Sequence, residues 1–123
     1  MAKVLIIEDE DGIQLLLKRV VGMLGHEVFV AGDGPTALAL ARDHAPDLII
    51  SDLSLPGKPS GLELVRELRA LKPDRPFVVT TGYTTGERLE AIQGEGIQHV
   101  LGKPFDILAA RSLVASLIGN AKA

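Results

Sequence analysis

The sequence contains no cysteine, and only 3% of its residues are aromatic. Without cysteine, the chain can form neither a disulfide framework nor a thiolate metal site. No stretch reaches the roughly 18 apolar residues of a membrane span, and the N-terminus opens directly into an apolar strand pattern rather than a signal peptide. The net charge of −3 argues against a nucleic-acid surface. We therefore expect a cytoplasmic protein that contacts neither nucleic acid nor membrane directly.

The length and the apolar content together indicate one well-packed domain. A chain of 123 residues is close to the commonest domain size. A hydrophobic content of 46% suits a parallel sheet that is covered on both faces, whose strands read as continuous apolar runs. We expect residues 1–119 to form a single domain, with 120–123 as a loose C-terminal tail or the start of a linker.

Apolar runs alternate with helical repeats along the whole chain. The runs predict five strands over about 3–7, 26–30, 47–52, 77–81 and 98–101. The repeats predict helices over about 11–24, from Gly34-Pro35 onward, and over about 61–71, 85–93 and 106–118. This alternation predicts an α/β fold, a flavodoxin-like (βα)5 three-layer sandwich whose five-stranded parallel sheet has the order 2-1-3-4-5.

Polar side chains follow the strands at the points where they end. Glu8 and Asp9 follow the first strand, Asp52 ends the third, Thr80 and Thr81 end the fourth, and Lys103 follows the fifth. Because the carboxyl ends of parallel strands meet at one edge of the sheet, we expect these groups in one shallow pocket. Three carboxylates repel each other unless a cation intervenes, and hard oxygen ligands suit Mg²⁺, for which Mn²⁺ could substitute. Lys103 and Thr81 would complete a phosphoryl cradle around a nucleophilic carboxylate.

Four motifs occur in order and together cover essentially the whole chain. They are Ile6-Ile7-Glu8-Asp9-Glu10, the stretch from Asp47 to Gly57 with Asp52 inside it, Thr81-Gly82 and Lys103-Pro104-Phe105. The set resembles the receiver (response regulator) domain of two-component signalling. The resemblance implies that Asp52 accepts a phosphoryl group from a phosphohistidine on a histidine kinase or a histidine phosphotransfer protein, and then loses it slowly to water. It also implies that Thr81 and Lys103 bind the phosphoryl oxygens.

The same resemblance assigns the metal shell and the groups that tune it. Asp9 matches the direct Mg²⁺ ligand, and Glu8 acts beside it, often through water. Asp52 and the backbone carbonyl of Ser54 complete the protein's share of the shell. Ser54 and Tyr83 match positions that tune dephosphorylation, and we expect both to do so here.

Three positions depart from the family pattern. Glu8 stands where Asp is common, and the loop over 56–61 is one residue longer than usual, with Ser-Gly in place of a frequent Asp-Gly. Together with Thr80-Thr81-Gly82-Tyr83, this loop is similar to those of receivers fused to hybrid histidine kinases. Val100 occupies a position where many receivers carry Tyr or Phe, so the aromatic–threonine switch cannot be carried over. We expect backbone movement over 81–86 to replace it.

The helical spacing predicts three buried stripes: Ile13, Leu16, Leu17, Val20 and Leu24 on the first helix, Leu62, Val65 and Leu68 on the third, and Ile107, Ala110, Val114, Leu117 and Ile118 on the last. Two sets of apolar residues fall outside these stripes. On the first helix, Leu15 and Met23 are either scattered surface apolars or, with Gly12 and Ile13, a docking patch for a kinase or phosphotransfer helix. On the last helix, Leu108 and Leu113 are either similarly scattered or join Val100 in an output or homodimer face. The sequence leaves both alternatives open.

Two other functions compete with a signalling phosphoacceptor that is not an enzyme in its own right. A haloacid-dehalogenase-like phosphohydrolase would also use Asp52 as nucleophile, but needs a second acid where this chain has Ser54. A flavodoxin-like nucleotide binder would need a phosphate-binding loop where this chain has Glu8 and Asp9.

The three histidines, His26, His44 and His99, lie apart along the chain, and we expect surface or edge positions for them rather than metal ligation.

Overall fold

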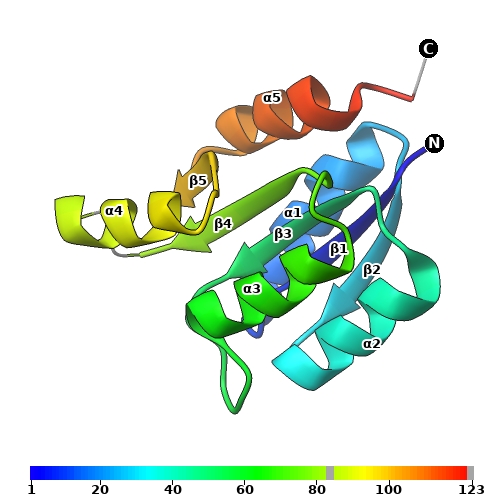
Figure 1. Ribbon diagram of the computed structural model, residues 1–123. Coiled ribbons are helices and arrows are strands. Elements are labelled where there is room, and N and C mark those ends of the chain that lie inside the picture. Colours follow the sequence, from blue (N-terminus) through cyan, green and yellow to red (C-terminus); the bar gives the residue numbers. More distant parts are fainter. Residues whose placement is uncertain (83–84, 122–123) are drawn as a thin grey trace.

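Five parallel strands form the centre of the molecule, whose computed structural model describes residues 1–82 and 85–121 (Figure 1). The strands are β1 (Lys3–Ile7), β2 (Glu27–Ala31), β3 (Leu48–Asp52), β4 (Phe77–Thr81) and β5 (His99–Gly102). Their order in the sheet is β2-β1-β3-β4-β5, and every pairing is parallel. The predicted fold class and strand order are therefore confirmed.

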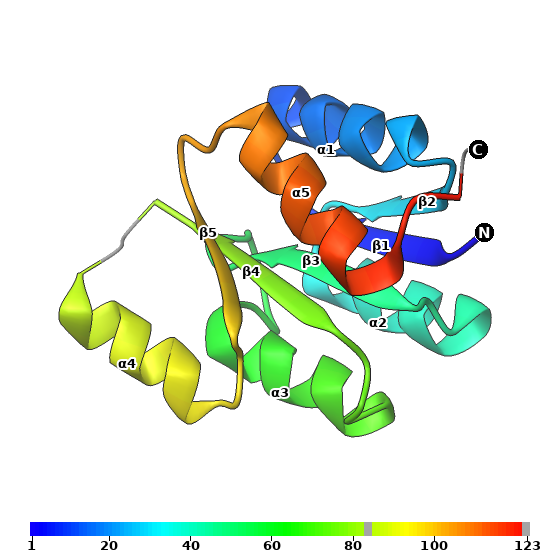
Figure 2. The same ribbon diagram turned by 90° about the horizontal axis from the view of Figure 1, so that it is seen from above.

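Five helices connect the strands and cover both faces of the sheet. They are α1 (Asp11–Met23), α2 (Gly34–His44), α3 (Gly61–Leu71), α4 (Gly86–Gly94) and α5 (Ile107–Ile118). In Figure 2, α1 and α5 lie on one side of the sheet, whereas α2, α3 and α4 lie on the other. Three layers result. Within the described residues, none of the helices has the length and apolar character that a membrane crossing requires.

The sheet divides the core into two aliphatic clusters, because successive residues of a strand face opposite sides. On the side of α1 and α5, the strands contribute Val4, Ile6, Leu48, Ile50, Val78 and Leu101. On the side of α2, α3 and α4, they contribute Leu5, Ile7, Ile49, Phe77 and Val79. Strand residues therefore point alternately into one cluster and the other, which decides the side on which each strand-end residue lies.

Some predicted helix faces are wrong in detail. Val21 and Leu64 are fully buried but were not expected in the core, while Leu62 is only partly buried. Ile107, expected in the buried stripe of α5, is 37% exposed. It is the first residue of its helix, and the first turn of α5 lies at the rim of the layer, where the i, i+3, i+4 rule no longer implies burial.

His26 is buried, which corrects the expectation of a surface or edge position. The backbone N–H of Ala2 donates to His26 Nδ1 (3.0 Å), and Nε2 lies 2.7 Å from the carbonyl oxygen of Gly119. Because a backbone N–H can only donate, Nδ1 is the acceptor and Nε2 carries the proton that Gly119 accepts. The N–H of Ala121 also donates to the carbonyl of Leu24 (2.7 Å), so the segment after α5 lies against the end of α1.

Candidate functional site

Three carboxylates gather at the carboxyl edge of the sheet. Glu8 and Asp9 follow β1, and Asp52 is the last residue of β3, the strand next to β1. One carboxylate oxygen of each residue lies within 4.8 Å of those of the other two. Glu8 and Asp52 are 1% and 3% exposed, whereas Asp9 lies at the surface. The strand-end acids predicted from the sequence thus meet, and the outermost of them faces solvent.

Lys103 joins the two buried acids. Its Nζ lies 2.7 Å from Glu8 Oε1 and 3.2 Å from Asp52 Oδ2, with 16% of its side chain exposed. The backbone N–H of Lys103 donates to the carbonyl of Thr81 (2.7 Å), which fixes the end of β5 against the end of β4. The peptide bond from Lys103 to Pro104 is cis. One ammonium therefore bridges the first and third strands from a position beyond the fifth.

Both carboxylate oxygens of Glu8 already have partners. Oε1 accepts from Lys103, and Oε2 accepts from the N–H groups of Asp9 (3.0 Å) and Glu10 (3.3 Å). Burial raises the pKa of Glu8, and the negative charge of Asp52 adds to this, although the bonds from Lys103 and the Glu10 N–H act in the opposite direction. The longer side chain at this position is thus held in place by the start of α1 rather than projecting over Asp9.

The pKa of Lys103 is raised as well. Burial by itself lowers it, but the hydrogen bonds to Glu8 and Asp52 and their negative charges outweigh burial. Asp52 Oδ2 forms an ion pair with Lys103 Nζ, and Asp52 Oδ1 accepts a hydrogen bond from the backbone N–H of Ser54 (3.2 Å). Lys103 is therefore held as a cation beside the carboxylate that is predicted to react.

The remaining predicted site residues occupy different environments. Thr81 is the last residue of β4 and is fully buried, and Ser54 is exposed directly after the strand that carries Asp52. Tyr83 lies outside the described residues, as does part of the 81–86 segment that was expected to replace the aromatic switch. The roles of Thr81, Ser54 and Tyr83 toward a phosphoryl group remain predictions.

The donor set suits a small divalent cation. Hard carboxylate oxygens are the ligands that Mg²⁺ prefers in proteins. Among these four groups, three carboxylates surround the single ammonium of Lys103, so a second cation can be accommodated. Asp9 accepts no hydrogen bond on its carboxylate from the described residues, and it is the acid best placed for a direct metal bond. The two engaged oxygens of Glu8 favour contact through water.

The predicted partner residues do not form one surface. On α1, Gly12 is exposed and Leu15 is 50% exposed, while Ile13 is partly buried against the core. Val100 packs against the cluster on the side of α2, α3 and α4, whereas Leu113 packs against the cluster on the side of α1 and α5. A surface containing both Val100 and Leu113 would have to wrap around the edge of β5.

One residue at the site, Gln14, was not recognised from the sequence, and another, Thr80, was expected there only as a strand-end residue without a role. Gln14 donates its side-chain N–H to the carbonyl of Glu8, which ties the first turn of α1 to the end of β1. Thr80 is 1% exposed and pairs with Asp52 across the β3–β4 ladder. The signal for Thr80 was present in the sequence, because two consecutive threonines that end a strand must point to opposite faces.

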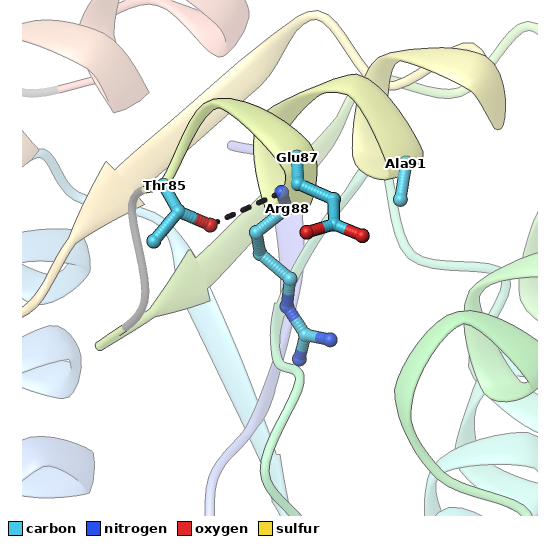
Figure 3. A pocket seen from close by; sticks show the side chains of 4 residues that line it. All are labelled: Thr85, Glu87, Arg88 and Ala91. Carbon is cyan, nitrogen blue, oxygen red and sulfur yellow. Dashed lines mark hydrogen bonds between the residues drawn. The ribbon is translucent and has the colours of Figure 1, made fainter.

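A hollow of about 480 Å³ lies elsewhere, on α4, and Figure 3 shows the side chains that line it: Thr85, Glu87, Arg88 and Ala91. The Thr85 hydroxyl accepts from the backbone N–H of Arg88 (3.3 Å) and caps the helix. None of these residues belongs to the acid cluster. This hollow and the acid cluster are therefore separate features of the structure.

Known proteins with the same arrangement are numerous. Residues 4–115 match the family described as the response regulator receiver domain. The chain is 30% identical over 112 residues to sporulation initiation phosphotransferase F of Bacillus subtilis, covering 91% of this chain and 90% of that protein. It is 32% identical over 126 residues to the virulence sensor protein BvgS of Bordetella pertussis, covering 97% of this chain but 10% of that protein.

Solved structures agree with the sequence comparison. The chemotaxis protein CheY4 of Vibrio cholerae superposes with a TM-score of 0.87 at 30% identity, over 96% of this chain and 99% of that one. Similar sequences thus occur both as nearly whole proteins and as a small part of a long sensor protein. With the acid cluster, the lysine bridge and the strand order all in place, the chain belongs to the response regulator receiver domain family.

Proposed function

We propose that this chain is the phosphoacceptor of a two-component phosphorelay and that Asp52 is the residue that takes the phosphoryl group from a phosphohistidine. The observation that carries the proposal is the Lys103 bridge to Asp52 and Glu8 within a cluster of three carboxylates. The comparisons support a phosphoacceptor receiver and give no support to a haloacid-dehalogenase-like hydrolase.

The residues present fit a Mg²⁺ ion. Asp9, Asp52 and the backbone carbonyl of Ser54 would hold it directly, with Glu8 acting through water, and Mn²⁺ could take its place. When bound, Mg²⁺ supplies positive charge that offsets the like charges of the carboxylate and the phosphoryl oxygens.

The protein groups position the reaction rather than supply covalent chemistry beyond Asp52. The Asp52 carboxylate attacks phosphorus in line with the departing imidazole nitrogen, and the Ser54 N–H on Oδ1 orients it. Lys103 turns one ammonium N–H toward the incoming phosphoryl oxygens while keeping its bond to Glu8. The Thr81 hydroxyl binds a second phosphoryl oxygen. Because Ser54 stands where a haloacid-dehalogenase-like hydrolase needs a second acid, the chain holds its product instead of turning over substrate.

Slow hydrolysis then resets the domain. Ser54 is exposed beside Asp52, where its side chain can shield or admit water, and we assign the same influence to Tyr83. Exchanging either residue for a smaller or an acidic one should change the rate of dephosphorylation at least severalfold. Unchanged rates for both would remove them from the set of tuning residues.

The partner is a histidine kinase or a histidine phosphotransfer protein in the cytoplasm. Gly12, Ile13 and Leu15 at the start of α1 lie beside the acids that end β1, so a helix carrying the phosphohistidine would contact them as it approaches Asp52. Leu15→Asp should slow transfer from such a protein while leaving transfer from a small phosphodonor unchanged. Output or dimer contacts would use the β5–α5 side, through Val100 or Leu113.

The central experiment uses Mg²⁺ and a small phosphodonor with intact-mass detection. Wild type should gain one phosphoryl group, and Asp52→Asn should gain none. Asp11→Asn is the matched control, because Asp11 is an exposed acid at the start of α1 outside the cluster, and it should behave as wild type. Rapid multiple turnover on assorted phosphate esters would instead establish a hydrolase.

A further inference from the structure

Thr80 carries a buried hydroxyl without a hydrogen-bond partner among the residues that the structure describes. The side chain is 1% exposed, and Oγ1 is sealed from solvent. Buried polar groups are normally hydrogen-bonded, since an unpaired one loses its interaction with water and gains nothing in return. Valine has the same shape and would fill this position without that cost. The fold alone therefore gives no reason for a hydroxyl here.

The sheet register places this hydroxyl beside the reactive carboxylate. Asp52 pairs with Thr80, and Thr80 pairs with Leu101, so the three form one row across β3, β4 and β5. Paired residues of parallel strands point to the same face, and Leu101 points into the cluster on the side of α1 and α5. Thr80 and Asp52 thus share a face, and Thr81 belongs to the other.

The side chain of Lys103 must cross β4 to reach Asp52. The lysine follows β5, whereas Asp52 is on β3, two strands away or roughly 9–10 Å at the usual strand spacing. Its ammonium nevertheless lies 3.2 Å from Asp52 Oδ2. On the face concerned, β4 presents Thr80, and the next position along the chain on that face is Gly82, which has no side chain. The unpaired hydroxyl therefore belongs to the strand that the lysine crosses, in the row of Asp52 and on the same face.

We infer that the Thr80 hydroxyl is a positioning group for phosphoryl transfer, one that hydrogen-bonds the Asp52 carboxyl oxygen released when Lys103 turns to the phosphoryl group. The inference rests on the proposed function. In the transfer, one Asp52 oxygen forms a bond to phosphorus while the phosphorus–nitrogen bond of the phosphohistidine breaks. The electron pair stays on that nitrogen, and the ring leaves as neutral imidazole when its other nitrogen carries a proton. The second Asp52 oxygen remains as a carbonyl, and Thr80 donates to it.

The cost of the unpaired hydroxyl in the resting domain is thereby offset in the phosphorylated one. Thr80→Val should stabilise the resting domain, because it removes the orphaned group, and should weaken the phosphorylated one, because it removes the new hydrogen bond. Thr80→Ser should lower the stability of the resting domain and leave binding of the phosphoryl group nearly unchanged. It keeps the hydroxyl, but it loses a buried methyl group and so lowers stability.

The test measures stability and binding of a phosphoryl mimic on the same three proteins. Urea unfolding without ligand should give midpoints in the order Val above Thr above Ser. Titration with beryllofluoride and Mg²⁺, followed by backbone amide NMR, should show binding weakened about 3- to 10-fold by Val, the effect of one hydrogen bond, and within about twofold of wild type for Ser. Phosphorylation from a small donor should likewise be weakened in the valine variant and close to wild type in the serine variant.

The failures are distinguishable. If Thr80→Val binds beryllofluoride as tightly as wild type, the hydroxyl has no such role. If Thr80→Val and Thr80→Ser lose binding equally, the role of the hydroxyl is also overturned, because packing would then be responsible. A wild-type protein that neither binds beryllofluoride nor accepts a phosphoryl group would overturn the proposed function, and this inference with it.

Discussion

Replacing Lys103 with methionine tests whether the lysine bridge organises the acid cluster. Methionine keeps most of the apolar stem but removes the ammonium that lies 2.7 Å from Glu8 and 3.2 Å from Asp52. Both acids are almost fully buried. Without the lysine, two carboxylates at close range would face each other without a counter-ion in the resting protein.

The expected loss of stability at pH 7 is about 3–5 kcal/mol, the cost of leaving a buried ion pair without one partner. The lower end is more appropriate, since Lys103 retains 16% exposure and Glu8 keeps two backbone N–H donors. With a urea m-value of about 1.5 kcal/mol/M, a loss of about 3 kcal/mol moves the midpoint down by about 2 M. A domain of this size is stable by roughly 5–15 kcal/mol, so the variant should still fold.

The loss should depend on pH in a direction fixed by Glu8. Burial already raises the pKa of this group in the fold, so its contribution to stability is fully present below the pKa of the unfolded chain and is lost as pH rises through the folded pKa. Removing Lys103 takes away the interactions that lower this pKa and raises it further. The raised pKa of Lys103 itself adds stability throughout the acidic and neutral range, and this is lost only at alkaline pH. The variant's loss of stability relative to wild type should therefore be smallest near pH 5 and largest at pH 7 and above.

Urea unfolding at pH 5, 6, 7 and 8, with EDTA present, measures this directly. Glu8→Gln and the double variant complete a cycle, in which Lys103→Met should cost less once Glu8 is neutral. A loss below about 1 kcal/mol at pH 7, or one that does not change between pH 5 and pH 8, would contradict the assignment of the lysine as counter-ion to the buried acids.

Three further outcomes are expected. Asp9→Asn should weaken Mg²⁺ binding by at least about tenfold, since even outer-shell partners are worth that much, while Glu10→Gln should change it little, as calorimetry will show. His26→Phe should cost about 1–3 kcal/mol in urea unfolding, because it removes the bonds that join Ala2 to Gly119. Leu64→Ala should cost about 2–5 kcal/mol for a side chain that is 0% exposed, leaving phosphorylation of the folded protein unchanged.

The fold could be predicted from the sequence because its signal is repeated along the chain. Each strand is a short apolar run, each helix carries a stripe, and the alternation leaves few topologies. The errors fall where a stripe is one residue too narrow, as at Val21 and Leu64, or where a helix begins at the rim, as at Ile107. His26 was misplaced for another reason. Its burial depends on two partners at opposite ends of the chain, which local pattern cannot join.

For the candidate site, the sequence predicted which residues meet but not how they are hydrogen-bonded to one another. That Glu8, Asp9, Asp52 and Lys103 would meet follows from the strand order and the rule that ligands bind at the carboxyl edge. That Glu8 is saturated by Lys103 and two N–H groups could not be predicted, because it depends on how the first turn of α1 folds back over the end of β1. The sequence therefore identified the ligands without showing which of them is free to bind a metal directly.

The face on which each threonine lies was open to prediction but needed the register. Thr81 ends β4 in the row of Gly102, and Thr80 lies one residue earlier in the row of Asp52. Because side chains alternate, only one of the two can lie on the same face as Asp52. Family resemblance assigns a phosphoryl-binding role to Thr81 and none to Thr80. The unpaired, buried hydroxyl of Thr80 becomes informative only when strand pairing shows that its neighbour in the sheet is the carboxylate that receives the phosphoryl group.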